Sequence, residues 1–552
     1  MNTRDYLNGK SSDGYNFFGA HKRKSNDYIF RLLAPNVKNV YLSGDFNNWE
    51  KTPLRKYSTG VFSATSDQAK NNDRYHFIIE DKDGKTYKKL DPYSRKISLD
   101  EDLSIIGDSN YKLKYKKVNK DTKNIYQIHL GALFRGVDDK KEVYKNIIDH
   151  VKENNFTHVQ IMPVSEYKNY KQMGYSSMGL FAFSERYGDI DDFKYFIDLL
   201  HKEKIGVILE LDISEFDPDF LYLDNFDGTN LYNYDYENIK YNYYGSINFD
   251  PSKNLTKSYL LSLVNYYLKE LKVDGIFFSS VENMIYWQGD KNRGVNEFWS
   301  ELIKEINQLI KANKAYSLAG FNGSYEDFDL GYDLVFDSEF RQMVEVFQKE
   351  PMNRAAYQKY IRNLITNAND QKIFGFSYVD SILNEANLAM KMYSDDRKID
   401  QLKTLFTFLM TIKSSKFIFM GDELADLRTF SIYNNFNFKD NDKVEFNLYY
   451  KDLTCLFLKS KAFSEDDSEI TLFDVDGYSI YAYERIYKNE KYLILVNFTD
   501  IEYKIRSPYD LEEVLNTNDL KYKGTGNING KVERNEEVHI EAFGSAIFKI
   551  KK

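Results

Sequence analysis

The sequence predicts an α/β protein built on a (β/α)8 barrel, with one β-sandwich before the barrel and another after it. In the middle of the chain, short apolar runs alternate with amphipathic helical stretches, which is the pattern of a parallel sheet with crossover helices. On both sides of that region, short strands are separated by turns, as in β-sandwiches. We expect an N-terminal segment, a first β-sandwich, a barrel and a C-terminal β-sandwich over residues 1–24, 25–118, 119–462 and 463–552.

Composition restricts the class of protein. The chain has 552 residues, of which 42% are hydrophobic and 29% charged, as in soluble proteins with several domains. A formal net charge of -9, without a basic stripe, argues against a nucleic-acid partner. The polar N-terminus lacks a signal peptide, no apolar run approaches the ~20 residues of a membrane helix, and the single cysteine, Cys455, excludes an internal disulfide. We expect a cytoplasmic protein without a membrane anchor, a metal or a cofactor.

The first β-sandwich is predicted from two strand patterns that end in turns. Tyr28–Asn36 contains F-x-x-x-A-P-N, and Val40–Trp49 contains G-D-F-N-x-W. These phrases resemble the glycogen-binding-type module of branching enzymes. Trp49 is therefore a candidate for stacking on a glucan, although a tryptophan at a strand end is as often a packing residue.

Eight strand candidates follow the lysine-rich linker at residues 112–123. Eight alternating strands and helices make a closed barrel, and in this fold the catalytic residues lie at the C-terminal ends of the strands. The candidates are Ile125–Leu130, Val159–Met162, Val207–Leu211, Gly275–Ser279, Tyr316–Ala319, Leu334–Phe336, Ile373–Ser377 and Lys416–Met420.

Ordered motifs along the barrel resemble those of glycogen branching enzymes, which belong to the α-amylase superfamily. They include Tyr126–Gly131, Phe156–Val164, Arg186–Gly188, Phe226–Tyr232 and Phe419–Gly421, which resemble Y-E-V-H-L-G, F-T-H-V-E-L-L-P-V, R-Y-G, F-D-G-T-x-L-Y and F-M-G. The resemblance implies a barrel that acts on α-glucans by retaining glycosyl transfer. That chemistry needs a carboxylate nucleophile and a general acid/base.

The strand ends depart from the family where its chemistry is expected. Val273–Val281 resembles the fourth-strand pattern D-G-[LF]-R-[VF]-D-A-V, which places the family's arginine at Phe277 and its nucleophilic aspartate at Ser279. At the fifth strand, A-E-[ED]-S places the general acid/base at Gly320. The resemblance therefore implies that the family's nucleophile and its general acid/base are both absent.

The third and seventh strand ends also differ from the family. At the third, D-W-V-P-x-H-F places an aspartate at Glu210 and a sugar-contacting histidine at Glu215. At the seventh, F-S-H-D-E places the histidine at Tyr378 and the third carboxylate at Val379. Losing a nucleophile costs on the order of a million-fold in turnover, and losing a general acid about a hundred- to ten-thousand-fold more. We therefore predict a catalytically inactive homologue that binds α-glucan, or that scaffolds or regulates active glycogen enzymes.

Two alternatives stay open. One is an α-1,4-glucan branching or transferase enzyme that uses displaced acids, for which Glu282 and Asp380 are the candidates; Glu326 and Asp327 lie further from the strand ends. The other is a protein-interaction scaffold whose sugar cleft is filled by side chains such as Phe277.

Aromatic side chains could retain sugar binding in the barrel. Tyr175 aligns with a tyrosine that stacks under a sugar in this superfamily. Tyr286 and Trp287 lie just beyond the altered fourth strand, where packing is the simpler explanation.

Overall fold

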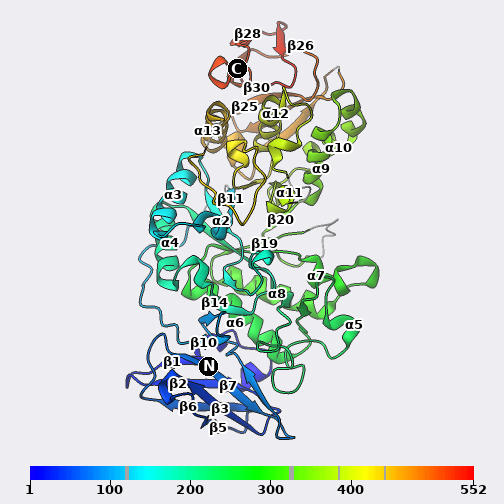
Figure 1. Ribbon diagram of the computed structural model, residues 1–552. Coiled ribbons are helices and arrows are strands. Elements are labelled where there is room, and N and C mark those ends of the chain that lie inside the picture. Colours follow the sequence, from blue (N-terminus) through cyan, green and yellow to red (C-terminus); the bar gives the residue numbers. More distant parts are fainter. Residues whose placement is uncertain (119–122, 322–328, 383–385, 441–442, 476, 552) are drawn as a thin grey trace.

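The computed structural model describes residues 1–118, 123–321, 329–382, 386–440, 443–475 and 477–551. Three parts follow one another along the molecule in chain order (Figure 1): an N-terminal β domain, a barrel and a C-terminal β domain. No helix in these ranges is long and apolar enough to cross a membrane. The predicted fold class is confirmed.

The N-terminal β domain consists of two antiparallel sheets, in the orders β1-β2-β6-β5 and β4-β3-β7-β10-β9, with β8 paired to β7. In β7, every second residue is buried, because alternate side chains of a strand point to opposite faces. The buried face of each sheet forms the core of the sandwich. The strands are β1 Gly19–Lys22, β2 Tyr28–Leu33, β3 Asn39–Gly44, β4 Thr52–Pro53, β5 Arg55–Lys56, β6 Val61–Ser66, β7 Arg74–Glu80, β8 Thr86–Lys89, β9 Lys96–Ser98 and β10 Leu103–Ile105.

The barrel is closed by eight parallel strands in the order β11-β12-β15-β18-β19-β20-β21-β22, and β11 pairs with β22. All eight predicted strands are present. They span Asn124–Ile128, His158–Ile161, Gly206–Leu211, Gly275–Phe278, Tyr316–Ala319, Leu334–Phe336, Lys372–Gly375 and Ser415–Phe419. Because the strands are parallel, all of their C-terminal ends meet at one mouth.

An apolar layer fills the barrel interior below this mouth. Phe277 of β18 belongs to it, and its ring stacks on Phe417 of β22 with 5.8 Å between the ring centroids. The neighbouring Ile276 and Phe278 belong to the larger core outside the barrel, as strand alternation requires. The buried members of the layer are Ile125, Ile208, Phe277, Leu318, Leu334, Phe336, Ile373 and Phe417.

Amphipathic helices cover the outside of the strands. In α8, apolar residues recur at helical spacing on the buried face, and the Asn296 side chain caps the helix by accepting from the backbone N–H of Trp299. The long helices around the barrel are α3 Lys140–Glu153, α4 Ile190–Lys202, α6 Asn254–Glu270, α8 Glu297–Ala312, α10 Gln358–Thr366, α12 Lys398–Thr411 and α13 Val444–Lys459.

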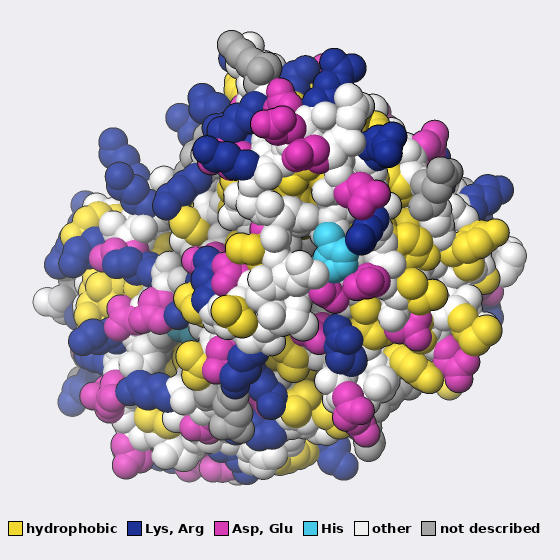
Figure 2. All heavy atoms as spheres, turned by 90° about the horizontal axis from the view of Figure 1, so that it is seen from above, with side chains coloured by type: hydrophobic (Ala, Val, Ile, Leu, Met, Phe, Trp, Pro, Cys, Tyr) yellow, Lys and Arg dark blue, Asp and Glu magenta, His cyan; other side chains and the backbone are white. Residues whose placement is uncertain are grey.

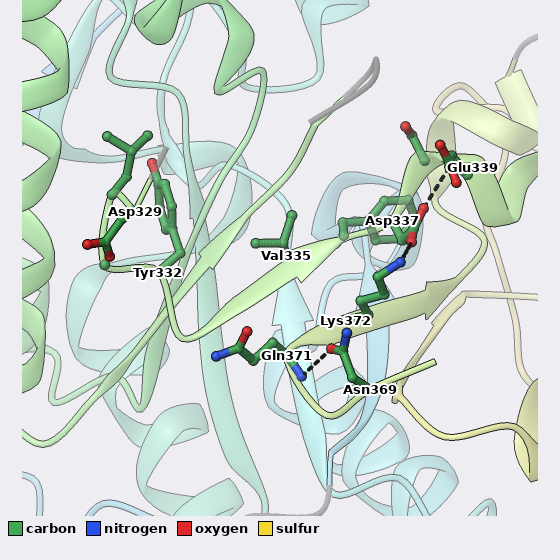
Figure 3. Close-up of a pocket in the computed structure, with 12 residues that line it drawn as sticks. Asp329, Tyr332, Val335, Asp337, Glu339, Asn369, Gln371 and Lys372 are labelled. Carbon is green, nitrogen blue, oxygen red and sulfur yellow. Dashed lines mark hydrogen bonds and ion pairs between the residues drawn. The ribbon is translucent and has the colours of Figure 1, made fainter. Parts of the chain in front are cut away.

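The crossover from β19 to β20 differs from the others. Its described residues, Gly320, Phe321 and 329–333, contain no helix, and a cavity of about 430 Å³ opens beside β20 and β21 (Figure 3). Lys372 and Asp337, from neighbouring strand edges, form an ion pair of 2.7 Å in its wall. Glu326 and Asp327, two acids noted in the sequence, lie outside the described residues.

The C-terminal β domain is a sheet in the order β23-β24-β25-β30-β27-β28, with the ribbon β26–β29 beside it. Figure 2 shows the molecule from this end, where basic and acidic side chains are interspersed. The strands are β23 Glu469–Phe473, β24 Ile480–Tyr487, β25 Glu490–Asn497, β26 Tyr503–Arg506, β27 Leu511–Asn516, β28 Lys531–Val532, β29 Glu537–Ile540 and β30 Ser545–Ile550.

Candidate active site at the barrel mouth

All of the positions singled out at four different strand ends, except Glu215, line one cavity at the barrel mouth. The closed barrel brings them together although they are far apart in the sequence. The cavity measures about 40 Å³, which is room for one water molecule, whereas ligand pockets usually measure about 300 Å³ or more. Its walls include Gln127, Glu210, Phe277, Ser279, Gly320, Phe336, Tyr378 and Val379.

Glu210, at the end of β15, is the acid that lines this cavity. The Gln160 Nε2 donates to its Oε2 over 2.7 Å, the Gln127 Nε2 donates to the same oxygen over 3.4 Å, and the Tyr175 hydroxyl donates to Oε1. Burial raises the pKa of Glu210 to about 7, although these three donors oppose the shift. The carboxyl group is therefore held near half protonation at neutral pH.

Two tyrosines cover Glu210. The rings of Tyr175 and Tyr378 stack with 5.7 Å between centroids, and burial raises the pKa of both hydroxyls above the usual value. The backbone N–H of Tyr378 donates to Gln127 Oε1 over 2.8 Å, so Gln127 contacts both Glu210 and Tyr378. Tyr175 thus stacks on a protein ring, in the place where the resemblance implies a sugar.

Two further carboxyl groups follow Glu210 on the same strand end. Burial raises the pKa of Asp212 to about 6, and burial together with the nearby Asp212 charge raises the pKa of Glu215 to about 8. The Ser214 hydroxyl donates to Asp212 Oδ1 over 2.6 Å, and the Asn242 side chain donates to Glu215. Sequence reasoning named Glu215 and missed Asp212. Its spacing of two from Glu210 was the available signal, because such residues share a face of a strand.

The opposite side of the mouth carries no acid at the aligned positions. Ser279 is buried, and its hydroxyl has no hydrogen-bond partner among the described residues. A Cβ added to Gly320 would lie 2.6 Å from two ring atoms of Phe277, closer than real Cβ contacts come. The Phe277 ring therefore occupies the space that a side chain at position 320 needs.

Neither displaced acid named in the sequence lines the cavity in the described part of the chain. Asp380 lies on α11 (Tyr378–Ile382) and is paired with Arg341, whose Nε donates to its Oδ1 over 2.7 Å. The backbone N–H of Ser377 donates to the other oxygen over 2.8 Å. Glu282 begins the short helix α7 (Glu282–Ile285) and is half-buried.

The candidate sugar-stacking residues are dispersed. Tyr286 is buried in the core, and Trp287 packs at a tilt against Tyr234, with 5.8 Å between centroids. Trp49 lies in the N-terminal β domain, where its ring is 38% exposed and stacks on His76. Trp49 is therefore available to a ligand, at a site separate from the barrel mouth.

Comparison with known proteins identifies the relatives of this chain. Residues 17–94 match carbohydrate-binding module 48 (isoamylase N-terminal domain), and residues 472–551 match the alpha amylase C-terminal all-beta domain. The 1,4-alpha-glucan branching enzyme GlgB 1 of Clostridium perfringens strain 13 is 29% identical, covering 94% of this chain and 86% of the relative. The GlgB of Bacillus cytotoxicus is 28% identical, covering 98% and 93%.

Solved structures share the fold. A pullulanase from an Anoxybacillus species, in complex with maltotetraose, superposes with a TM-score of 0.79 at 15% identity, covering 100% of this chain and 89% of that chain. A putative alpha amylase from Salmonella typhimurium superposes with a TM-score of 0.76 at 15% identity, covering 97% and 100%. The chain is a homologue of GlgB-type branching enzymes with an alpha-amylase superfamily fold.

The prediction that this protein is not an enzyme is wrong. Relatives that match almost the whole chain are named as branching enzymes, and its structural neighbours include pullulanases, so the comparisons point to an enzyme. The prediction rested on the family's own acid positions. It named Glu210 and Glu215 only as altered site positions and did not name Asp212.

Proposed function

We propose that this homologue of the branching enzymes is itself an α-1,4-glucan branching or transferase enzyme, in which the catalytic acids are displaced to the end of β15. The observation that supports this most is Glu210. It is the acid that lines the cavity at the barrel mouth, and its pKa is raised to about 7. Strongly shifted acids in a cleft at the C-terminal ends of barrel strands are characteristic of catalytic sites.

Two of these carboxyl groups, Glu210 and Asp212, divide the roles that glycosyl transfer needs. A general acid protonates the departing glycosidic oxygen, and a second carboxylate stabilises or attacks the sugar. Glu210 supplies the acid, since a group with a pKa near neutral transfers protons efficiently at that pH. We assign the carboxylate role to Asp212, two residues further on, whose Oδ1 accepts from the backbone N–H and the hydroxyl of Ser214.

Substrate entry requires the tyrosine pair to move. The cavity of about 40 Å³ is too small for a glucosyl unit, and Tyr175 and Tyr378 are stacked over the acid. A sugar ring that replaced Tyr378 against Tyr175 would recover the stacking contact and meet the carboxyl group beneath. Glu210 is already buried before substrate enters, so its environment is set by the barrel itself.

The test is turnover of amylose, followed by iodine absorbance. We expect Glu210→Gln to lower turnover about a hundred- to ten-thousand-fold, because the amide keeps the shape of the side chain and cannot donate the proton. Glu282→Gln, a half-buried acid outside the cavity wall, is the matched control and should retain wild-type turnover. Loss of turnover in Glu282→Gln or Asp380→Asn, with Glu210→Gln unchanged, would overturn the proposal.

A further inference from the structure

Tyrosines are unusually exposed on one turn beside the barrel mouth. The turn at residues 242–246, here called the tyrosine turn, joins the short helix α5 (Glu237–Lys240) to β17 (Ile247–Asn248). At its tip, Tyr243 is 95% exposed and Tyr244 is 82% exposed. Their rings stand at 87° to each other, with 5.4 Å between centroids. Two large aromatic side chains are thus presented almost completely to solvent.

A dense set of hydrogen bonds holds this turn in place. The Asn242 Oδ1 accepts from the backbone N–H of Tyr244 over 2.9 Å and from that of Ser246 over 3.0 Å. The backbone N–H of Asn242 also donates to the carbonyl oxygen of Ser246 over 2.9 Å. Gly245 has a φ of +88°, a conformation that favours glycine. The hydrogen bonds of the turn therefore fix the backbone that carries the two exposed rings.

The same turn is tied to the candidate active site. The Asn242 side chain donates to Glu215, which begins β16 shortly after β15 ends, and the Ser246 hydroxyl bonds to that of Ser176 over 2.8 Å. Ser176 follows Tyr175, which covers Glu210. The strands β16 (Glu215–Phe216) and β17 pair antiparallel between them. The tyrosine turn is thus connected through these contacts to the barrel mouth, where the proposed chemistry occurs.

We propose that the tyrosine turn is an additional α-glucan-binding surface, which holds a glucan chain outside the mouth by stacking on Tyr243 and Tyr244. The identity of the ligand rests on the proposed function. Two rings at a turn tip form a patch much smaller than a protein interface, whereas each ring offers an apolar face and a hydroxyl to a sugar. The neighbouring Asn242 and Ser246 side chains are uncharged, which suits a neutral chain.

The test is native electrophoresis in gels that contain glycogen, where retardation measures the dissociation constant. We expect the double variant Tyr243→Ala with Tyr244→Ala to bind glycogen about tenfold more weakly, equivalent to about 1.4 kcal/mol. Tyr243→Phe with Tyr244→Phe keeps the rings and should remain within about twofold of wild type. The matched control is Tyr478→Ala, which removes a 73% exposed tyrosine of the C-terminal β domain and should not change retardation.

The readouts separate this proposal from the proposed function. Retardation does not require turnover, so it remains informative if Glu210→Gln leaves catalysis unchanged. Equal retardation of wild type and the alanine variant would overturn the proposal. So would a change in sedimentation coefficient on alanine substitution, which would identify the rings as a contact between copies of the chain.

Discussion

The two sides of the barrel mouth differ in what they bury: one buries carboxyl groups and the other buries an aromatic ring. The β15 side carries Glu210, Asp212 and Glu215, and each accepts hydrogen bonds from neighbouring side chains. The β18–β19 side presents the Phe277 ring and Gly320, and it lacks a carboxyl group at the aligned positions. On the β15 side, hydrogen-bond donors accompany the buried carboxyl groups. The β18–β19 side is filled with apolar side chains, because an unpaired buried charge costs several kcal/mol.

The contrast bears on the proposed function, because the carboxyl groups that it requires lie on the side where side-chain donors are found. Gln160 donates to Glu210, and Asn242 donates to Glu215. These donors offset part of the cost of burying the carboxyl groups there.

The largest expected effect on stability concerns Asp380, an acid that lies outside the cavity wall on both sides of the mouth. Arg341→Met should lower the free energy of unfolding by about 3–5 kcal/mol, because it leaves a buried carboxylate without its cation. Urea denaturation measures this. Arg428→Met is the control, since its partly exposed pair with Asp426 should contribute less than about 1 kcal/mol. Equal losses in the two variants would mean that the Asp380 pair is not a structural one.

The next effect tests the burial of charge on the β15 side. Glu210 has a folded pKa of about 7 against an ordinary 4.5, so the folded state binds more protons between these values. Stability from this group is therefore present below about pH 4.5 and lost as pH rises through 7, by an amount on the order of 3 kcal/mol. The free energy of unfolding of wild type should fall more between pH 5 and 8 than that of Glu210→Gln. Parallel pH profiles would place Glu210 in contact with water.

The smallest effect tests the filled side of the mouth. Gly320→Ala should destabilise by about 1–3 kcal/mol, because its Cβ would overlap the Phe277 ring. The φ angle of Gly320 lies outside the left-handed region, so backbone strain does not contribute. In a Phe277→Leu background, the same substitution should cost less, giving a coupling energy above about 0.5 kcal/mol in a double-mutant cycle. Additive costs would show that the two positions are independent.

The fold could be predicted from the sequence because its signals are local. Apolar runs and turn residues mark each barrel strand, and the closed arrangement of eight then determines which ends meet. For this reason Glu210, Phe277, Ser279, Gly320, Tyr378 and Val379, predicted from separate motifs, line one cavity.

The interactions within the mouth could not be predicted in the same way. The ring of Tyr175 stacks on that of Tyr378, which comes from another strand end, and no motif in the sequence indicates this contact. The link between Asn242 and Glu215 joins a loop to a strand, and no local pattern encodes it. The raised pKa of Asp212 arises from burial in the assembled barrel, which its spacing from Glu210 in the sequence does not reveal.

The overlap between the Phe277 ring and any side chain at position 320 also limits the evolution of this barrel. An acidic residue introduced at position 320 by one mutation meets the aromatic ring, and shortening position 277 by one mutation first leaves a void. A sequence with Phe277 and Gly320 must therefore pass through a poorly packed intermediate before it can accommodate an acid at position 320. The arrangement therefore makes substitution at position 320 depend on a second change at position 277.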